Sequence, residues 1–115
     1  EYHHDRKADA PSGTAIKSAE LIAAAKPEIN EPILDEQHII KGSRGAIKNN
    51  IPIHAIRIPG VVANQEIIFG ALGQSLTLRH DTISREAFMP GLLIAIKATS
   101  SHVGLVYGLE SLLNL

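Results

Sequence analysis

Segments with β-strand character lie together in the middle of this chain, and segments with helical character lie on either side of them. The clearest strand spans residues 74–80, where two leucines alternate with serine, threonine and arginine. Helices and strands that are grouped in this way favour an α+β fold over a doubly wound α/β fold, in which they would alternate along the chain. The sequence therefore predicts a mixed β-sheet covered by helices.

Turn residues divide the central region into strands. Residues 65–69 and 74–80 are predicted to form two strands joined around Gly70–Gly73, and residues 52–58 are rich in β-branched side chains and end at Pro59–Gly60. Because the side chains of a strand alternate between its two faces, one face of residues 74–80 is expected to lie in water or in an interface.

Helical patterns flank this region. Residues 15–26 are rich in helix formers and stop at Pro27, and Ser12 is a good N-cap for their first turn. One face of this predicted helix carries Ile16, Ala19, Ile22 and Ala23. Pro90 removes a backbone donor, so we expect a short turn at residues 85–88 and a regular helix from residue 90 onward. A short apolar helix is expected at residues 109–113.

Residues 27–50 show no sustained periodicity and contain Gly42, Ser43 and Gly45. They are predicted to form a long loop, and a loop of this length inside a compact domain is usually functional or mobile.

Composition narrows the class of protein. The chain has 115 residues, of which 44% are hydrophobic and 20% charged, which fits one globular domain with a core of its own. A formal charge of -1 gives no reason to expect nucleic acid or an anionic membrane as a partner. No apolar stretch is long enough to cross a bilayer and no signal segment opens the chain, while the absence of cysteine fits a reducing cytosol.

The first residue is Glu1 rather than methionine, and a dense polar motif follows at once. No G-x-G-x-x-G sequence is present, so a Rossmann-type dinucleotide turn is absent. We interpret the chain as a fragment of a larger enzyme.

The polar motif spans Glu1–Ala15 and brings histidines, a lysine and a helix start into fifteen positions. At the end of a strand, His3 and His4 would point to opposite sides and could have different tasks. The free amides of Gly13 and Thr14, with the ammonium of Lys7, would form a cradle for a carboxylate or phosphate. The residues therefore indicate an anion site.

Two other interpretations of these residues stay open at this stage. The motif could be a solvated turn followed by a capped helix, since capping alone accounts for Ser12. The second interpretation is a metal-dependent hydrolase, whose ligands would come from His3, His4, His54, His80 and Asp9. However, no H-E-x-x-H pair is present.

The run E-x-H-H-x-x-K-x-D-A-P-S-G-T-A, present as Glu1–Ala15, resembles the signature of the dihydrodipicolinate reductases. Further similarity follows in the same order, in residues 41–46, 56–60, 64–70, 84–85 and 88–91. The resemblance implies that the chain is the C-terminal substrate-binding and tetramerisation domain, residues 1–115, of a two-domain enzyme.

The family reduces an unsaturated cyclic dicarboxylate to tetrahydrodipicolinate with NADH or NADPH, in the diaminopimelate route to lysine. The resemblance implies that His3 is the proton donor and that Lys7 is the second catalytic group. It gives His4, Ser12, Gly13 and Thr14 the task of holding the substrate's carboxylates. Histidine suits proton exchange near neutral pH, so the residue types agree with that chemistry.

The resemblance further places Arg85 and Phe88 near the cofactor, which would bind mainly to the missing N-terminal domain. It implies a homotetramer in the bacterial cytoplasm, or in the plastid stroma if the source is a plant, and no resident metal. We expect the isolated chain to lack reductase activity. An alternative from another functional class is that the chain is a non-catalytic oligomerisation module.

Overall fold

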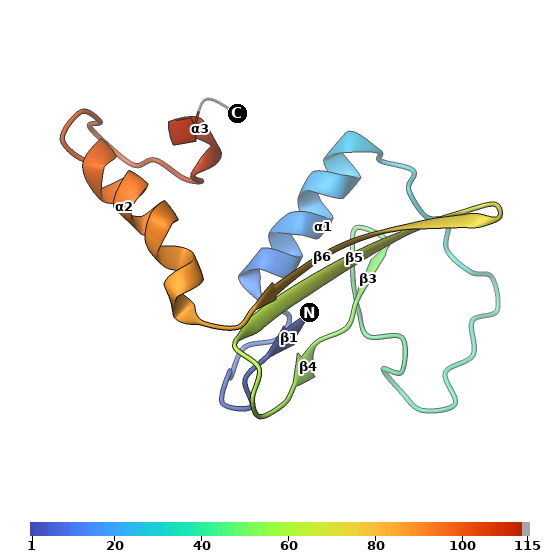
Figure 1. Cartoon of the computed structure of the whole chain (residues 1–115). Helices are drawn as coiled ribbons and strands as arrows, with labels where there is room; N and C mark the ends of the chain where they lie inside the picture. The colour runs from blue at the N-terminus through green and yellow to red at the C-terminus, as the bar shows by residue number, and fades with distance from the viewer. Residues whose placement is uncertain (114–115) are drawn as a thin grey trace. The chain divides into compact units, whose positions relative to one another are not determined.

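A computed structural model describes residues 1–113, which form two compact units, residues 1–81 and the residues from 82 onward. The first unit contains a four-stranded sheet in the order β4-β1-β5-β6 (Figure 1). Its strands are β1 (Tyr2–His3), β4 (Ile56–Arg57), β5 (Ala63–Ala71) and β6 (Gln74–Thr82). Strand β1 pairs in parallel with β4 and antiparallel with β5, so the sheet is mixed, as predicted.

The long hairpin of β5 and β6 confirms the two strands predicted on either side of Gly70–Gly73, and both are longer than expected. The two strands run side by side in Figure 1. Gly73 has a φ of 70°, a conformation that glycine adopts without steric cost. Strand β6 is at the edge of the sheet, and all its residues except Thr82 are exposed.

Part of the predicted loop at residues 27–50 is instead a strand. Residues 46–48 form β2 (Ala46–Lys48), which pairs antiparallel with β3 (Ile51–Ile53) in a separate two-stranded sheet. Asn49 and Asn50, with φ values of 51° and 60°, form the two-residue turn between them. Asparagine tolerates this left-handed conformation, so the Asn-Asn pair is a hairpin signal that the loop prediction overlooked.

Helix α1 (Gly13–Ala25) confirms the predicted amphipathic helix and begins two residues earlier than expected. It buries Ala15 and Ala19 against Ile53 of β3, with Ile51 beside them. The backbone of residue 45 also approaches β3 closely, because a Cβ on Gly45 would lie 2.4 Å from the carbonyl oxygen of Ile53. Small side chains at these positions allow the helix, the hairpin and the preceding loop to pack together.

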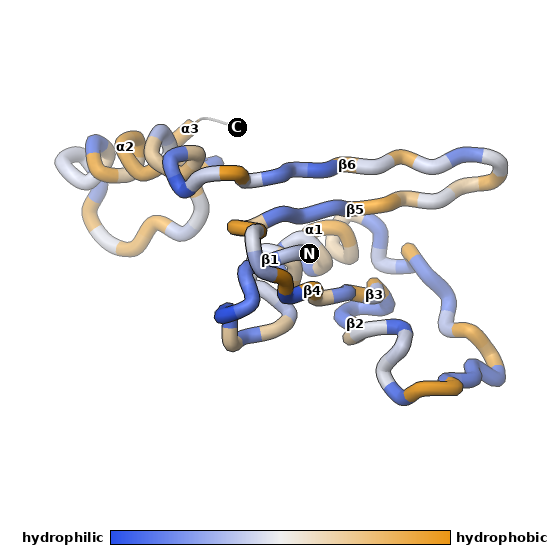
Figure 2. Tube along the Cα trace, turned by 60° about the horizontal axis from the view of Figure 1, so that its bottom comes forward, coloured by the Kyte–Doolittle hydropathy of each residue, from blue (hydrophilic) through white to orange (hydrophobic). Residues whose placement is uncertain are grey.

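The expected apolar core is small. Among the described residues, Ala15, Ala19 and Ile53 are the buried hydrophobic side chains, whereas larger ones such as Leu76 and Leu78 of β6 are more than half exposed. Figure 2 shows that the strands of the β5–β6 hairpin carry both hydrophobic and hydrophilic stretches. Most of the large hydrophobic side chains among the described residues therefore lie at surfaces rather than in a closed interior.

The second unit contains a 3-10 helix η1 (Arg85–Phe88), helix α2 (Met89–Ala98) and helix α3 (Glu110–Leu113). The short turn at residues 85–88 is confirmed, and α2 starts one residue before Pro90, where proline is tolerated in the first turn. None of the helices in the described residues is long and apolar enough to cross a membrane.

Candidate functional site

The polar motif runs from strand β1 to the first turn of α1. The strand ends at His3, and the backbone amide of Lys7 then donates to the carbonyl oxygen of His4 at 3.1 Å. His3, His4 and Lys7 are half-buried, whereas Asp5 and Arg6 at the tip of the turn are exposed. The turn thus keeps the motif's two histidines and its lysine at the border between protein and solvent.

Glu1 is the centre of a hydrogen-bond network that spacing in the sequence did not reveal. Its side chain is 1% exposed, and its Oε2 contacts the Nδ1 of His3. Arg57 of β4 forms a two-pronged pair with it, from Nη1 to Oε2 and from Nη2 to Oε1, both at 3.0 Å. The backbone amide of Ser12 donates to Oε1 at 3.2 Å. One carboxylate therefore joins β1, β4 and the start of α1.

The pKa of Glu1 is set by opposing effects. Burial is the largest single influence and raises it, but hydrogen bonds from Arg57, His3 and the Ser12 amide together lower it below the ordinary value. Glu1 is therefore a charged carboxylate at neutral pH. A charged carboxylate only accepts hydrogen bonds, so the groups that face it must be donors.

Lys7 is held by Asp9. The Lys7 Nζ lies 2.6 and 2.7 Å from the two carboxylate oxygens of Asp9, and this hydrogen bond is the main reason why the pKa of Asp9 is lowered. Arg57 Nη2 donates to the backbone oxygen of Asp9 at 2.7 Å. Asp9 thus contacts the predicted catalytic lysine and ties it to Arg57.

The start of α1 has the arrangement that the sequence predicts for a helix cap. Ser12 is buried, and its Oγ accepts from the amide of Ala15 at 3.2 Å. Gly13 and Thr14 are exposed, and as the first two residues of the helix they have no preceding carbonyl in it to which their amides could donate. A Cβ added to Gly13 would meet open space, so the protein itself does not require glycine there.

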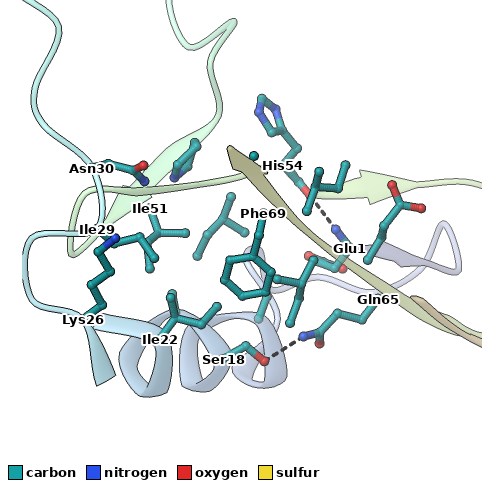
Figure 3. A pocket seen from close by; sticks show the side chains of 18 of the residues that line it. Glu1, Ser18, Ile22, Lys26, Ile29, Asn30, Ile51, His54, Gln65 and Phe69 are labelled. Carbon is teal, nitrogen blue, oxygen red and sulfur yellow. Dashed lines mark hydrogen bonds between the residues drawn. The ribbon is translucent and has the colours of Figure 1, made fainter. Parts of the chain in front are cut away.

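A cavity of about 960 Å³ lies beside this motif, between α1 and the strands of the first unit. In Figure 3, Ile22, Ile51 and Phe69 point into it, and the Nε2 of Gln65 donates to the Oγ of Ser18 at 2.7 Å. The motif residues His3, His4, Lys7, Ser12, Gly13 and Thr14 do not line it. The predicted anion cradle is therefore separate from this largely apolar space.

Several other candidate residues have different environments. His54 and His80, which the sequence offered as possible metal ligands, are both exposed. Within residues 1–113, no three side chains of histidine, aspartate or glutamate are grouped so that they could hold a metal ion. Arg85 and Phe88 lie on η1 in the second unit, and their role near a cofactor stays a prediction.

The fold and the motif together define an α+β domain, in which two histidines, a lysine and a helix start lie in one short segment beside a mixed sheet. The family model described as "Dihydrodipicolinate reductase, C-terminus" matches residues 1–113. The chain belongs to this family, and the resemblance seen in its sequence is confirmed.

Curated relatives show the same likeness. The 4-hydroxy-tetrahydrodipicolinate reductase of Moorella thermoacetica is 55% identical over 115 residues, which cover 98% of this chain and 42% of that protein. The enzyme of the same name from Streptococcus gordonii is 53% identical over 113 residues, covering 98% of this chain and 44% of that protein. The chain thus spans less than half the length of these relatives.

A solved structure agrees with the fold. The dipicolinate-bound dihydrodipicolinate reductase from Paenisporosarcina sp. TG-14 matches with a TM-score of 0.81 and 46% sequence identity, over 96% of this chain and 42% of that one. The predicted α+β class, with a mixed sheet and helices, is therefore confirmed.

Proposed function

We propose that this chain is the substrate-binding half of a 4-hydroxy-tetrahydrodipicolinate reductase. The whole enzyme would reduce an unsaturated cyclic dicarboxylate to tetrahydrodipicolinate with NADH or NADPH. The family match over residues 1–113 and relatives of that name support the proposal. The nicotinamide nucleotide would bind mainly to the part of the relatives that this chain does not cover.

The observation that carries the proposal is a continuous hydrogen-bond network across the motif. His3 contacts Glu1, Glu1 binds Arg57 and the amide of Ser12, and Arg57 reaches Asp9, which holds Lys7. A proton donor, a cation and a helix start are thereby fixed to one framework. Such fixed donors suit a ligand with two carboxylates, because its orientation is set before reaction.

Each residue has a task that its chemistry allows. The amides of Gly13 and Thr14, with the Thr14 hydroxyl, His4 and Lys7, would hold the carboxylates, and the capped Ser12 would keep those amides in place. The nicotinamide, when bound, supplies a hydride. Hydride addition to a conjugated double bond builds negative charge at its far end, and His3 would donate the proton that neutralises it.

The residues present fit part of a nucleotide site. Arg85 and Phe88 are both exposed on η1, where a guanidinium could pair with a phosphate and an aromatic ring could contact a base or nicotinamide. We propose them as the contribution of this chain to cofactor binding.

A chimera would test the proposed function directly. The chain would replace the matching region of the Moorella thermoacetica relative, and oxidation of NADH and NADPH would be followed with the cyclic dicarboxylate substrate. We expect turnover, and a loss of kcat of about 10²-fold or more in His3→Gln, because a general acid contributes roughly that much. His80→Gln, which changes an exposed histidine on β6, is the matched control. A folded chimera without turnover would contradict the proposal.

We also propose that the chain self-associates, as a homotetramer, through its sheet. Strand β6 is a nine-residue edge strand, and Leu76 and Leu78 on it are more than half exposed. An edge of this length with exposed leucines favours pairing with another chain. A chain that self-associates but binds no dicarboxylate would be a non-catalytic oligomerisation module. Dicarboxylate binding by the motif would instead favour the reductase half.

A further inference from the structure

The buried Glu1 carboxylate contacts the imidazole of the predicted proton donor. We propose that Glu1 is a positioning residue, which keeps a proton on Nδ1 of His3 and so leaves Nε2 as the nitrogen that exchanges a proton with the ligand. The identity of that ligand rests on the proposed function, whereas the state of the His3 ring does not.

The environment of Glu1 leaves its carboxylate little freedom. Both oxygens are engaged by Arg57 at 3.0 Å, and Oε1 also accepts from the Ser12 amide at 3.2 Å. The side chain is 1% exposed, compared with 16% for His3 and 18% for Arg57. A carboxylate held from several sides cannot turn away from the imidazole, so Nδ1 remains the nitrogen that faces it.

Donor and acceptor chemistry then determines the state of the histidine ring. A neutral imidazole has one N–H donor and one acceptor nitrogen, and the nitrogen that faces a carboxylate must be the donor. Nδ1 of His3 therefore carries the proton. Within the described part of the chain, Nε2 has no hydrogen-bond partner, so it is open to a ligand.

The proton count agrees with the proposed role. A protonated His3 carries N–H groups on both ring nitrogens. When the Nε2 proton passes to the ligand carbon that gains charge as the hydride arrives, a neutral imidazole remains, with its Nδ1–H on Glu1. A proton from water then restores the acid. Glu1 stays ionised throughout, and the lowered pKa of its carboxyl agrees with this.

Glu1 also connects the acid to the anion cradle. Its Oε2 contacts His3, and its Oε1 holds the amide of Ser12, the residue that caps α1. One side chain thus contacts both the His3 ring and the residue that caps the cradle helix. This coupling distinguishes Glu1 from a residue that only stabilises the fold.

Nitrogen-15 NMR of histidine-labelled chain tests the proposal, at a pH high enough that the histidine signals no longer change with pH. The His3 signals would be assigned by their loss in His3→Gln. We expect the Nδ1–H tautomer in the wild type and the Nε2–H tautomer in Glu1→Gln, whose amide can donate to Nδ1. Glu66→Gln, a carboxylate on β5 that pairs with Arg79, is the control and should change nothing.

An Nε2–H tautomer in the wild-type chain would overturn the proposal, and this result does not depend on whether Glu1→Gln folds. An unchanged Nδ1–H tautomer in a folded Glu1→Gln chain would also overturn it. In the chimera, Glu1→Gln should lower kcat by about 10²-fold, on the scale of a lost general acid, while the Kd for pyridine-2,6-dicarboxylate changes less than about twofold. If the tautomer is as proposed but the wild-type chimera is inactive, the proposed function fails and the positioning of His3 does not.

Discussion

Two arginines in this chain bind acidic side chains in different surroundings. Arg57 meets Glu1 in the motif, where the carboxylate is 1% exposed, whereas Arg79 meets Glu66 and Asp81 on the β5–β6 hairpin, where the arginine itself is 52% exposed. The first pair organises a site from residues that are far apart in sequence. The second lies on the surface of two strands that their own turn already joins. An arginine–carboxylate pair thus holds distant residues of the motif together in one region, whereas in the other such pairs lie on a solvent-exposed surface.

The largest expected effect is on stability when each arginine is replaced in turn. Arg57→Met leaves the buried Glu1 charge without its partner and should lower the free energy of unfolding by about 3–5 kcal/mol. Arg79→Met removes an exposed pair that solvent screens, so its effect on the free energy of unfolding should be much smaller. Urea unfolding of both variants measures the difference, and equal losses would remove the contrast between the two regions.

The next effect concerns ligand binding rather than stability. Gly13→Ala places a methyl group in the open space at the start of α1, where the protein meets no clash. We expect stability to stay equal or to rise by up to about 1 kcal/mol, because alanine loses less backbone entropy on folding. Binding of pyridine-2,6-dicarboxylate should weaken at least about tenfold, or 1.4 kcal/mol, if the ligand approaches the Gly13 backbone.

Calorimetric titration measures that loss. Gly70→Ala is the control, since a Cβ at Gly70 of β5 also meets open space. If Gly13→Ala binds as tightly as the wild type, the start of α1 is not the cradle.

Lowering the pH should reduce the stability that the motif contributes, because it protonates the Glu1 carboxylate. The groups that face this carboxylate are Arg57, His3 and the Ser12 amide, and they lower its pKa in the folded chain. The stabilisation it provides is therefore complete above its unfolded pKa, near the ordinary value of 4.5, and is lost as the pH falls through the lower folded pKa.

Unfolding free energies measured from pH 7 down to pH 3 test this sign. The stability of the wild type should decline more steeply below pH 4.5 than that of Glu1→Gln, which has no carboxyl to protonate at this position. Parallel curves for the two proteins would show that Glu1 is not held as a charged group.

The smallest expected change in folding stability is on β6. Leu78→Lys alters a side chain that is 53% exposed, so the free energy of unfolding of a single chain should shift by no more than about 0.5 kcal/mol. Self-association should nevertheless weaken, because the charge would have to be buried in the proposed interface. Sedimentation equilibrium checks the oligomeric state, and self-association as strong as that of the wild type would place the interface elsewhere.

Local patterns predicted the parts of the fold that local chemistry determines. Helix α1, its Ser12 cap, the β5–β6 hairpin and the turn before Pro90 each have a periodicity or a breaker in the adjacent sequence. The β-branched run at residues 52–58 indicated a strand, and the structure divides these residues between β3 and β4. The two-residue strand β1 has no periodicity of its own, since it exists through pairing of Tyr2 with Ile56 and Asn64. Strand β2 was missed because the Asn49–Asn50 turn was interpreted as part of a loop.

The candidate site likewise has a part that local sequence predicts and a part that depends on distant residues. The motif supplied His3, His4, Lys7 and the helix start because they are close in sequence. It could not reveal that Arg57 pairs with Glu1, since 56 positions separate the two residues and folding alone brings them together. The only signal was that Arg57 lies in one of the blocks that resemble the reductase family, without a role attached to it.

If the proposed function is right, the motif of the folded chain is a preformed cradle for a dicarboxylate. Calorimetric titration of pyridine-2,6-dicarboxylate into the wild type, Lys7→Ala and Lys48→Ala tests it most directly, because Lys48 is a lysine of β2 that pairs with Glu20 outside the motif. We expect saturable binding by the wild type and Lys48→Ala, and binding at least about tenfold weaker in Lys7→Ala. No binding by the folded wild type, or equal binding by all three, would contradict it.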